Sequence, residues 1–130
     1  MNERGFKQKL RALIKPYAYI QSMSSLATAG TPDLWISDLN DLWLEVKWDE
    51  TTKGPIKPKL SALQAAWCNN RAQEGRNVMV LVGVDSKTAI LYQGYQELDG
   101  GNAFAWNTHS NERRPLKDIV AELVAFVQDK

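Results

Sequence analysis

The feature that most constrains the fold of this chain is one uninterrupted apolar run, Val78-Met79-Val80-Leu81-Val82. A strand with one face in water alternates apolar and polar residues, whereas a strand covered on both faces is apolar throughout. The run has the length of a strand, and segments with a helical spacing of apolar residues stand on both sides of it in the sequence. A buried strand with helices available to cover it predicts an α/β fold, with helices packed on a small mixed sheet.

Three segments carry the apolar spacing of amphipathic helices. The first covers residues 3–15 and ends at Pro16, which cannot continue a helix. The second covers residues 61–74, and Gly75 behind it is a typical stop signal. The third begins at Pro115, because proline is favoured in the first turn of a helix.

Further strands are expected beside the buried one. Residues 17–23 form a candidate first strand, and residues 88–92 form a candidate neighbour that follows the buried run. Residues 93–114 show no regular pattern, and we expect them to be irregular.

The composition of the chain limits its class. At 130 residues it has the size of one domain, and we expect residues 1–130 to form a single core. The formal charge of +1 excludes a uniformly basic nucleic-acid coat, so a DNA-binding surface would be a local patch. One cysteine excludes an internal disulfide, and the longest apolar run is too short to span a membrane. The polar start is unlike a signal segment, so we expect a cytoplasmic protein with no membrane partner.

Three chemistry-bearing residues fall on two neighbouring runs with strand character. Asp33 lies in the first run, and Glu45 and Lys47 lie in the second, with a short polar turn at residues 38–41 between them. Residues two apart on a strand share a face, so Glu45 and Lys47 project together, and the turn folds Asp33 toward Glu45. Two carboxylates and an ammonium on one surface can hold a divalent metal beside a water, which is the chemistry of phosphodiester cleavage. Taken singly, an aspartate after a proline is more often a turn residue, and a Glu-x-Lys pair is more often a solvated strand face.

The order of these motifs resembles a known family. The segments that carry the resemblance are Gly30-Thr31-Pro32-Asp33-Leu34, Trp43-Leu44-Glu45-Val46-Lys47 and Ser61-Ala62-Leu63-Gln64-Ala65-Ala66-Trp67. In this order they are similar to the PD-(D/E)XK nuclease superfamily, in particular to small stand-alone VRR-NUC-type nucleases, many of them carried by phages, and to Holliday junction resolvase-like proteins. The resemblance implies a restriction-endonuclease-like fold, in which a central mixed β-sheet is flanked by helices.

The resemblance also implies a Mg²⁺ or Mn²⁺ ion at the acidic pair. Asp33 and Glu45 would be its ligands, with the backbone carbonyl of Val46 as a further one. Hard cations of this kind prefer oxygen ligands, and Mg²⁺ usually keeps several waters beside one or two carboxylates. Related nucleases often add an acid from the first helix, and Glu3 is the only acid within residues 3–15. The helix dipole also favours an acid in a first turn, so both roles of Glu3 stay open.

Lys47 and Gln64 complete the expected catalytic set with Asp33 and Glu45. Lys47 would position the attacking water and stabilise negative charge on the phosphate. In the family, a helix glutamine contributes to the site near the metal waters or the phosphate. Ser61-x-x-Gln64 is also a capping box, in which the glutamine side chain returns to the backbone of the N-cap residue. The two uses compete for one amide group, and we favour the role in the site.

Basic residues near these motifs are the expected DNA contacts. The connection of residues 49–59 contains glycine and proline and is expected to be a loop. Its lysines follow the catalytic strand, which favours phosphate contacts, although exposed lysines are often only solvated charges. The expected contacts are Lys53, Lys57 and Lys59 in this loop, and Arg4 and Lys7 on the first helix.

The inventory of residues excludes several other chemistries. His109 is the only histidine and Cys68 the only cysteine, which excludes a zinc site of the usual nitrogen and sulfur type. A Ser-His-Asp triad would need His109, which stands in the segment expected to be irregular, and the chain has no nucleophile elbow. No glycine-rich phosphate loop is present, so no nucleotide cofactor is expected.

Together these observations predict a Mg²⁺- or Mn²⁺-dependent DNA endonuclease that hydrolyses phosphodiester bonds. The resemblance implies selectivity for branched DNA such as Holliday junctions, and a homodimer, since two symmetric cuts need two sites. A phage-encoded enzyme of this kind would act in the host cell. Two alternatives stay open: a nuclease acting on flaps, ends or single strands, and a non-cleaving DNA-binding module on a nuclease fold. The intact set of Asp33, Glu45 and Lys47 argues against the second alternative.

Overall fold

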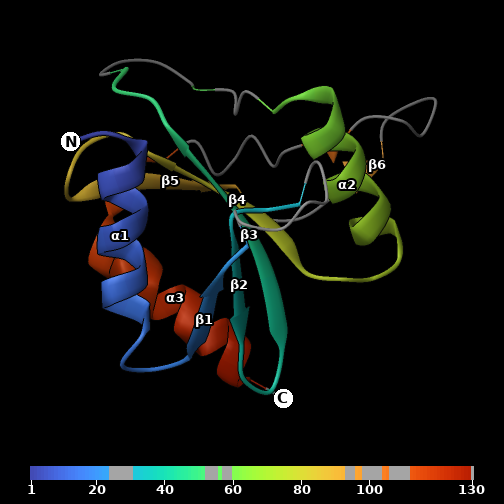
Figure 1. The fold of residues 1–130 in the computed structure, drawn as a ribbon, viewed down its shortest axis with the longest axis horizontal. Coiled ribbons are helices and arrows are strands. Elements are labelled where there is room, and N and C mark those ends of the chain that lie inside the picture. Colours follow the sequence, from blue (N-terminus) through green and yellow to red (C-terminus); the bar gives the residue numbers. More distant parts are fainter. Residues whose placement is uncertain are drawn as a thin grey trace.

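A computed structural model gives the fold of the chain and describes residues 1–23, 31–51, 56, 60–92 and 112–129, with the backbone alone at residues 96–97 and 104–105. The helices and strands are, in chain order, α1 (Glu3–Ile14), β1 (Tyr19–Ser22), β2 (Leu34–Ser37), β3 (Asp41–Trp48), α2 (Ala62–Gln73), β4 (Val78–Gly83), β5 (Thr88–Tyr92), β6 (Gln96–Glu97), β7 (Phe104–Ala105), β8 (Arg114–Pro115) and α3 (Leu116–Gln128). Six strands form one mixed sheet in the order β1-β2-β3-β4-β5-β8. Helices α1 and α3 pack together on one side of the sheet, and α2 lies on the other side (Figure 1).

The apolar run marked as buried in the sequence is β4, at the centre of the sheet. All six of its residues are buried, and it pairs in parallel with β3 and antiparallel with β5. Its side chains enter two apolar clusters in alternation. Met79 and Leu81 join the larger cluster with α1 and α3, whereas Val80 and Val82 join a smaller cluster on the opposite face. The predicted strand with two covered faces and the α/β class are confirmed.

The predicted turn folds β2 onto β3 as an antiparallel hairpin. Leu34 pairs with Leu44, and Trp35 pairs with Trp43. Leu34 and Leu44 are buried in the larger cluster, while the two tryptophan rings stack on the other face of the hairpin with their centroids 5.8 Å apart. Alternation along each strand therefore gives the hairpin one core face and one face on the side of α2.

The first strand is shorter than the sequence predicts. The sequence predicts a strand over residues 17–23, whereas β1 begins at Tyr19 and ends at Ser22. The amides of Tyr17 and Ala18 both donate hydrogen bonds to the carbonyl of Ile14, so these residues complete the end of α1 instead of extending β1.

The expectation of an irregular segment over residues 93–114 is wrong in part. Two-residue strands β6 and β7 pair with each other, and Arg114 of β8 pairs with Ala89 of β5. Strands this short carry no periodic signal in the sequence. His109 lies outside the described residues. Within the described part of the chain, no helix has the length and apolar character needed to cross a membrane.

Helix α1 approaches the sheet most closely at Gly83, the last residue of β4. A Cβ atom built on Gly83 would lie 2.7 Å from a ring carbon of Phe6, a distance that real Cβ contacts do not show. The ring of Phe6 is fully buried and also contacts the ring of Trp48 on β3, at 5.5 Å between centroids. Because this contact fixes Phe6, it also fixes the position on α1 of Lys7, the next residue.

Candidate active site

The hairpin brings the two predicted acids together at the start of β2. Since Leu34 pairs with Leu44, Asp33 stands one position further along the register, opposite Glu45. The ladder between the strands ends there, and the side chain of Asp33 continues it: its Oδ2 accepts a hydrogen bond from the backbone N–H of Val46 at 2.9 Å. A carboxylate fixed by a backbone donor has a defined position relative to β3.

Asp33 is the charged member of the pair. Burial by itself would raise the pKa of its carboxyl, but hydrogen bonds with Glu45, with the Val46 N–H and with Lys7 together hold the pKa below its ordinary value. The Lys7 ammonium adds an attraction between opposite charges.

Glu45 is the neutral member of the pair as long as no cation is bound. It is 1% exposed, and among the described residues its Oε2 has no hydrogen-bond partner. Burial first, and then the hydrogen bond and the charge of Asp33, raise the pKa of Glu45 to about 9. A buried carboxyl with an unpartnered oxygen is costly unless it is protonated or binds a cation. Oε2 is therefore an oxygen that a metal ion could use.

Lys47 lies two residues beyond Glu45 on the same face of β3, as predicted, and contacts α2. Its Nζ donates a hydrogen bond to Oε1 of Gln64 at 3.0 Å. The same oxygen accepts the backbone N–H of Ser61 at 2.9 Å, and Oγ of Ser61 accepts the backbone N–H of Gln64 at 3.1 Å. The complete capping box thus forms at the start of α2.

The capping role of Gln64 does not exclude a contact with a predicted site residue. One carbonyl oxygen has two lone pairs, so Oε1 of Gln64 accepts from both Ser61 and Lys47. The cap of α2 thereby orients the ammonium of Lys47. Whether Gln64 takes part in catalysis stays a prediction.

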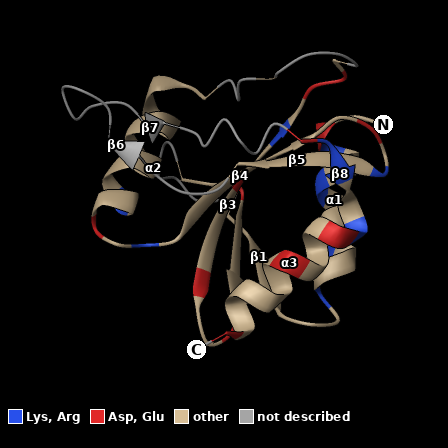
Figure 2. Ribbon diagram, turned by 180° about the vertical axis from the view of Figure 1, so that it is seen from behind, with Lys and Arg blue, Asp and Glu red and all other residues tan. Residues whose placement is uncertain are grey.

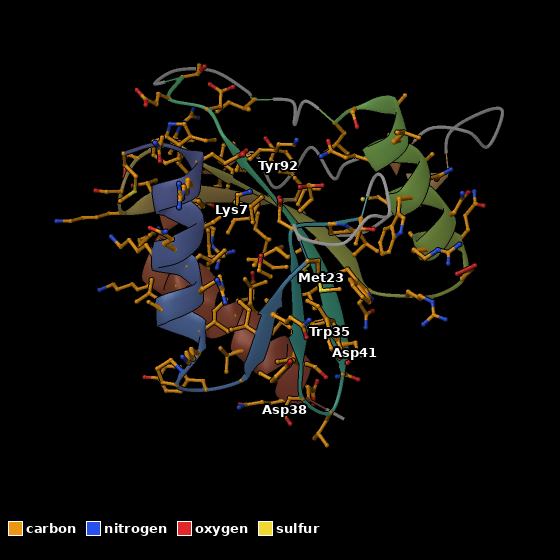
Figure 3. The ribbon with its side chains drawn as sticks, viewed as in Figure 1. Lys7, Met23, Trp35, Asp38, Asp41 and Tyr92 are labelled. Carbon is orange, nitrogen blue, oxygen red and sulfur yellow. The ribbon has the colours of Figure 1, made fainter. Side chains whose placement is uncertain are left out.

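Lys7 lies at the acidic pair, a position that the sequence did not indicate. Its Nζ is 3.0 Å from Oδ1 of Asp33 and 3.7 Å from Oε2 of Glu3, one turn earlier on α1. Figure 3 shows Lys7 between α1 and the strands of the sheet. The sequence pattern gives only a basic residue four positions after an acid, which is common on solvated helices. The sequence predicts Lys7 only as a DNA contact and does not predict its ion pair with Asp33.

The donor set fits a hard divalent cation with few protein ligands. Asp33 and Glu45 present two carboxylates, and Mg²⁺ commonly binds one or two and keeps its remaining waters. Among the described residues, no three acids, histidines or cysteines are grouped closely enough to hold a metal. Glu3 contacts Lys7 and is partly exposed, so its role as a ligand, like that of the Val46 carbonyl, stays a prediction.

Helix α2 closes the side of the site with a buried thiol. Cys68 is fully buried, and burial first, followed by the charge of Glu45, raises the pKa of the thiol to about 12. A thiol with this pKa is protonated and inert as a nucleophile at neutral pH. Cys68 therefore places a neutral side chain near Glu45, and no pattern in the sequence predicts this placement.

A row of aromatic rings continues the face of the hairpin that carries the acidic pair. Tyr19 contacts Trp35 edge-on, Trp35 stacks on Trp43, and Trp43 contacts Trp67 of α2 edge-on. Arg71 lies over the ring of Trp67, 5.9 Å from its centroid. Trp35 is labelled in Figure 3, on the hairpin. The row joins β1, β2, β3 and α2, and so fixes the hairpin relative to the helix that holds Lys47.

The expected DNA contacts are only partly described. Lys53, Lys57 and Lys59 lie outside the described residues. Arg4 is exposed in the first turn of α1. Helix α1 carries more basic than acidic residues, whereas α3 carries Lys117, Asp118 and Glu122. Figure 2 marks the charged residues on the ribbon.

No protein-family model matches the sequence, and no curated protein matches it. The mixed six-stranded sheet with its flanking helices has the restriction-endonuclease-like fold, as predicted. A solved structure similar to this chain is Hjc of Archaeoglobus fulgidus, a Holliday junction resolvase from an archaeal hyperthermophile. The TM-score is 0.57 at 16% sequence identity, and the match covers 93% of this chain and 98% of that chain. Likeness at this level of identity establishes the fold.

Proposed function

We propose that this protein is a metal-dependent nuclease that hydrolyses phosphodiester bonds in DNA. The observation that carries the proposal is the acidic pair at the start of β2. Asp33 is held by a backbone N–H, and beside it Glu45 is buried with an oxygen that has no hydrogen-bond partner within the described part of the chain. Lys47 stands on the same strand face as Glu45, and its ammonium is oriented by Gln64. Enzymes of this chemistry need such a combination of oxygen ligands and a positive charge.

Asp33 and Glu45 would hold a Mg²⁺ or Mn²⁺ ion, with the Val46 carbonyl and Glu3 as proposed additional ligands. When bound, the cation lowers the pKa of a coordinated water and neutralises charge on the phosphate. Lys47 adds a fixed positive charge that can position the water and stabilise the phosphate as negative charge develops. Gln64 keeps that ammonium in place from the start of α2.

Branched DNA, such as a Holliday junction, is the proposed substrate. The likeness of the fold to a Holliday junction resolvase supports this choice, as does the order of the Asp33, Glu45-x-Lys47 and Gln64 motifs, which is similar to VRR-NUC-type phage nucleases. Symmetric cleavage of a junction needs two sites, so the active form is proposed to be a homodimer. Arg4 and the lysines of residues 49–59 are proposed to bind phosphates beside the site.

The proposal is tested by incubating the purified protein with junction, flap, linear duplex and single-stranded DNA of matched sequence. Each reaction is run with Mg²⁺, with Mn²⁺ and with chelator, and Asp33→Asn is the control for contaminating nuclease. Junction cleavage that requires metal and the wild-type residue is the expected result. Preferred cleavage of flaps or single strands would reassign the substrate. Binding without cleavage under every condition would contradict the nuclease proposal.

A further inference from the structure

The two oxygens of Asp33 have different kinds of partner. Oδ2 accepts from the backbone of Val46, which is fixed within β3, whereas Oδ1 accepts from the Nζ of Lys7 at 3.0 Å. A backbone amide in a sheet cannot move away without breaking the sheet. A lysine ammonium, at the end of a flexible four-carbon side chain, can move away without disturbing the backbone. The hydrogen-bond partner of Oδ1 can therefore be exchanged for another cation, whereas the partner of Oδ2 cannot.

The base of the Lys7 side chain is held firmly while its end has freedom. Phe6 and Leu10, on either side of Lys7 in the sequence, are fully buried in the larger cluster, and Phe6 packs tightly on Gly83. The Lys7 side chain is 25% exposed, and a second carboxylate lies 3.7 Å from its Nζ, on Glu3. The ammonium can thus leave Asp33 toward Glu3, whose side chain is 45% exposed, or toward solvent if Glu3 itself binds the metal.

We infer that Lys7 is the resident counter-cation of the acidic pair, and that a divalent metal binds by displacing its ammonium from Oδ1 of Asp33. This inference rests on the proposed metal-dependent function. An ammonium within hydrogen-bond distance of the metal's ligand would repel a divalent ion strongly in a partly buried site. Lys7 therefore holds Asp33 in place before the metal arrives and lowers the affinity for the metal by competing with it.

A purely structural role for Lys7 makes the opposite prediction. If the lysine only holds Asp33 in position, removal of the lysine leaves the carboxylate misplaced and weakens metal binding. If the two cations compete, removal of the lysine strengthens metal binding. The sign of the change in metal affinity separates these roles without any measurement of cleavage.

The test is calorimetric titration of Mn²⁺ into the DNA-free protein at fixed pH and ionic strength. Lys7→Met should bind Mn²⁺ about tenfold more tightly than wild type, the size of one charge-assisted hydrogen bond. Lys7→Gln, which removes the charge and keeps a donor for Asp33, should show the same direction and serves if the methionine variant does not fold. Lys7→Arg should stay close to wild type. Lys15→Met removes one charge from the exposed end of α1 and should leave the affinity unchanged.

Thermal unfolding supplies a second measurement on the same variants. In chelator, Lys7→Met should melt below wild type, and saturating Mn²⁺ should raise its melting temperature more than that of wild type. An affinity for Mn²⁺ that is unchanged or weaker in both Lys7→Met and Lys7→Gln, with normal binding by wild type, would overturn the inference alone. A wild-type protein that binds no Mn²⁺ would overturn the metal-dependent function and the inference together.

Discussion

The backbone amide of Val46 donates a hydrogen bond of 2.9 Å to Oδ2 of Asp33, at the point where the β2–β3 ladder ends. The Asp33 carboxylate thus accepts a backbone N–H that a longer β2 would have bonded with its own backbone. The position of the Asp33 carboxylate is therefore set by the register of the hairpin, and the sequence from Leu34 to Leu44 determines that register.

Asp33→Asn should abolish cleavage while the fold is retained. The asparagine oxygen can still accept from Val46, but the loss of one charge weakens metal binding and ends activation of the water. DNA binding should persist or strengthen, since less negative charge faces the phosphates. Single-turnover cleavage and melting temperature measured on one preparation test this, with Asp118→Asn on α3 as the matched control. Cleavage by Asp33→Asn at a rate near that of wild type would remove Asp33 from the site.

The metal-free protein should lose stability as the pH rises from about 4.5 to about 9. The pKa of Glu45 is raised from its ordinary value of 4.5 to about 9, so over this range the folded state holds a proton that the unfolded state has released. The state that binds more protons is favoured at low pH, and this contribution is lost as the pH passes the folded pKa. Glu45→Gln should flatten the dependence and raise the melting temperature at pH 8. Denaturant titrations in chelator at several pH values measure the effect, with exposed Glu50→Gln as the control.

Lys47→Met should slow cleavage by at least about a hundredfold, the scale of losing one preorganised charge at a transition state. Affinity for Mn²⁺ should change little, because Nζ of Lys47 donates its hydrogen bond to Gln64 and acts on Glu45 only through its charge. Single-turnover rates at saturating Mn²⁺, together with metal titrations, distinguish the two effects. A variant that binds metal poorly but cleaves normally when saturated would show that Lys47 is structural.

Gln64→Glu should keep or raise the stability of the protein and lower its activity. Glutamate completes the capping box equally well, and a negative charge in the first turn is favourable to the helix dipole. The new charge would also pair with Lys47 and repel the phosphate. The cleavage rate should fall by about tenfold or more, each factor of ten corresponding to roughly 1.4 kcal/mol of barrier. A fully stable and fully active variant would leave Gln64 with the capping role alone.

Gly83→Ala should destabilise the protein by about 1–3 kcal/mol, the usual cost of an extra methyl group in a packed site. The new Cβ would lie 2.7 Å from the Phe6 ring and push α1 away from β4. Phe6→Leu in the same chain should recover part of the loss, because the smaller side chain makes room. A double-mutant cycle of unfolding free energies measures the coupling. Additive effects of the two substitutions would show that the contact is not tight.

The elements that sequence patterns predict best are those whose pattern is long. β4 is apolar at every position, and the hairpin is fixed by two runs with a polar turn, so the meeting of Asp33 and Glu45 follows from the sequence. The contact of Lys7 with Asp33 does not, because it depends on how closely α1 approaches Gly83. Such an approach is a tertiary property with no periodic signature.

Gln64 shows a different limit. The sequence identifies its capping box and its place in the family-like motif, but not that both involve the same oxygen. The geometry shows that one oxygen accepts both hydrogen bonds, since Ser61 and Lys47 approach it together. Whether two donors can reach one acceptor depends on the distance between α2 and β3, which residue types alone do not give.

The shared oxygen of Gln64 also connects a local motion to the site. The ends of helices open more often than their centres, and these openings are brief compared with global unfolding. When the first turn of α2 opens, Gln64 leaves Ser61 and Lys47 at the same moment. The ammonium of Lys47 is then free to reorient, although the sheet beneath it has not moved. Amide hydrogen exchange in the first turn of α2 therefore reports how often Lys47 loses its hydrogen bond to Gln64.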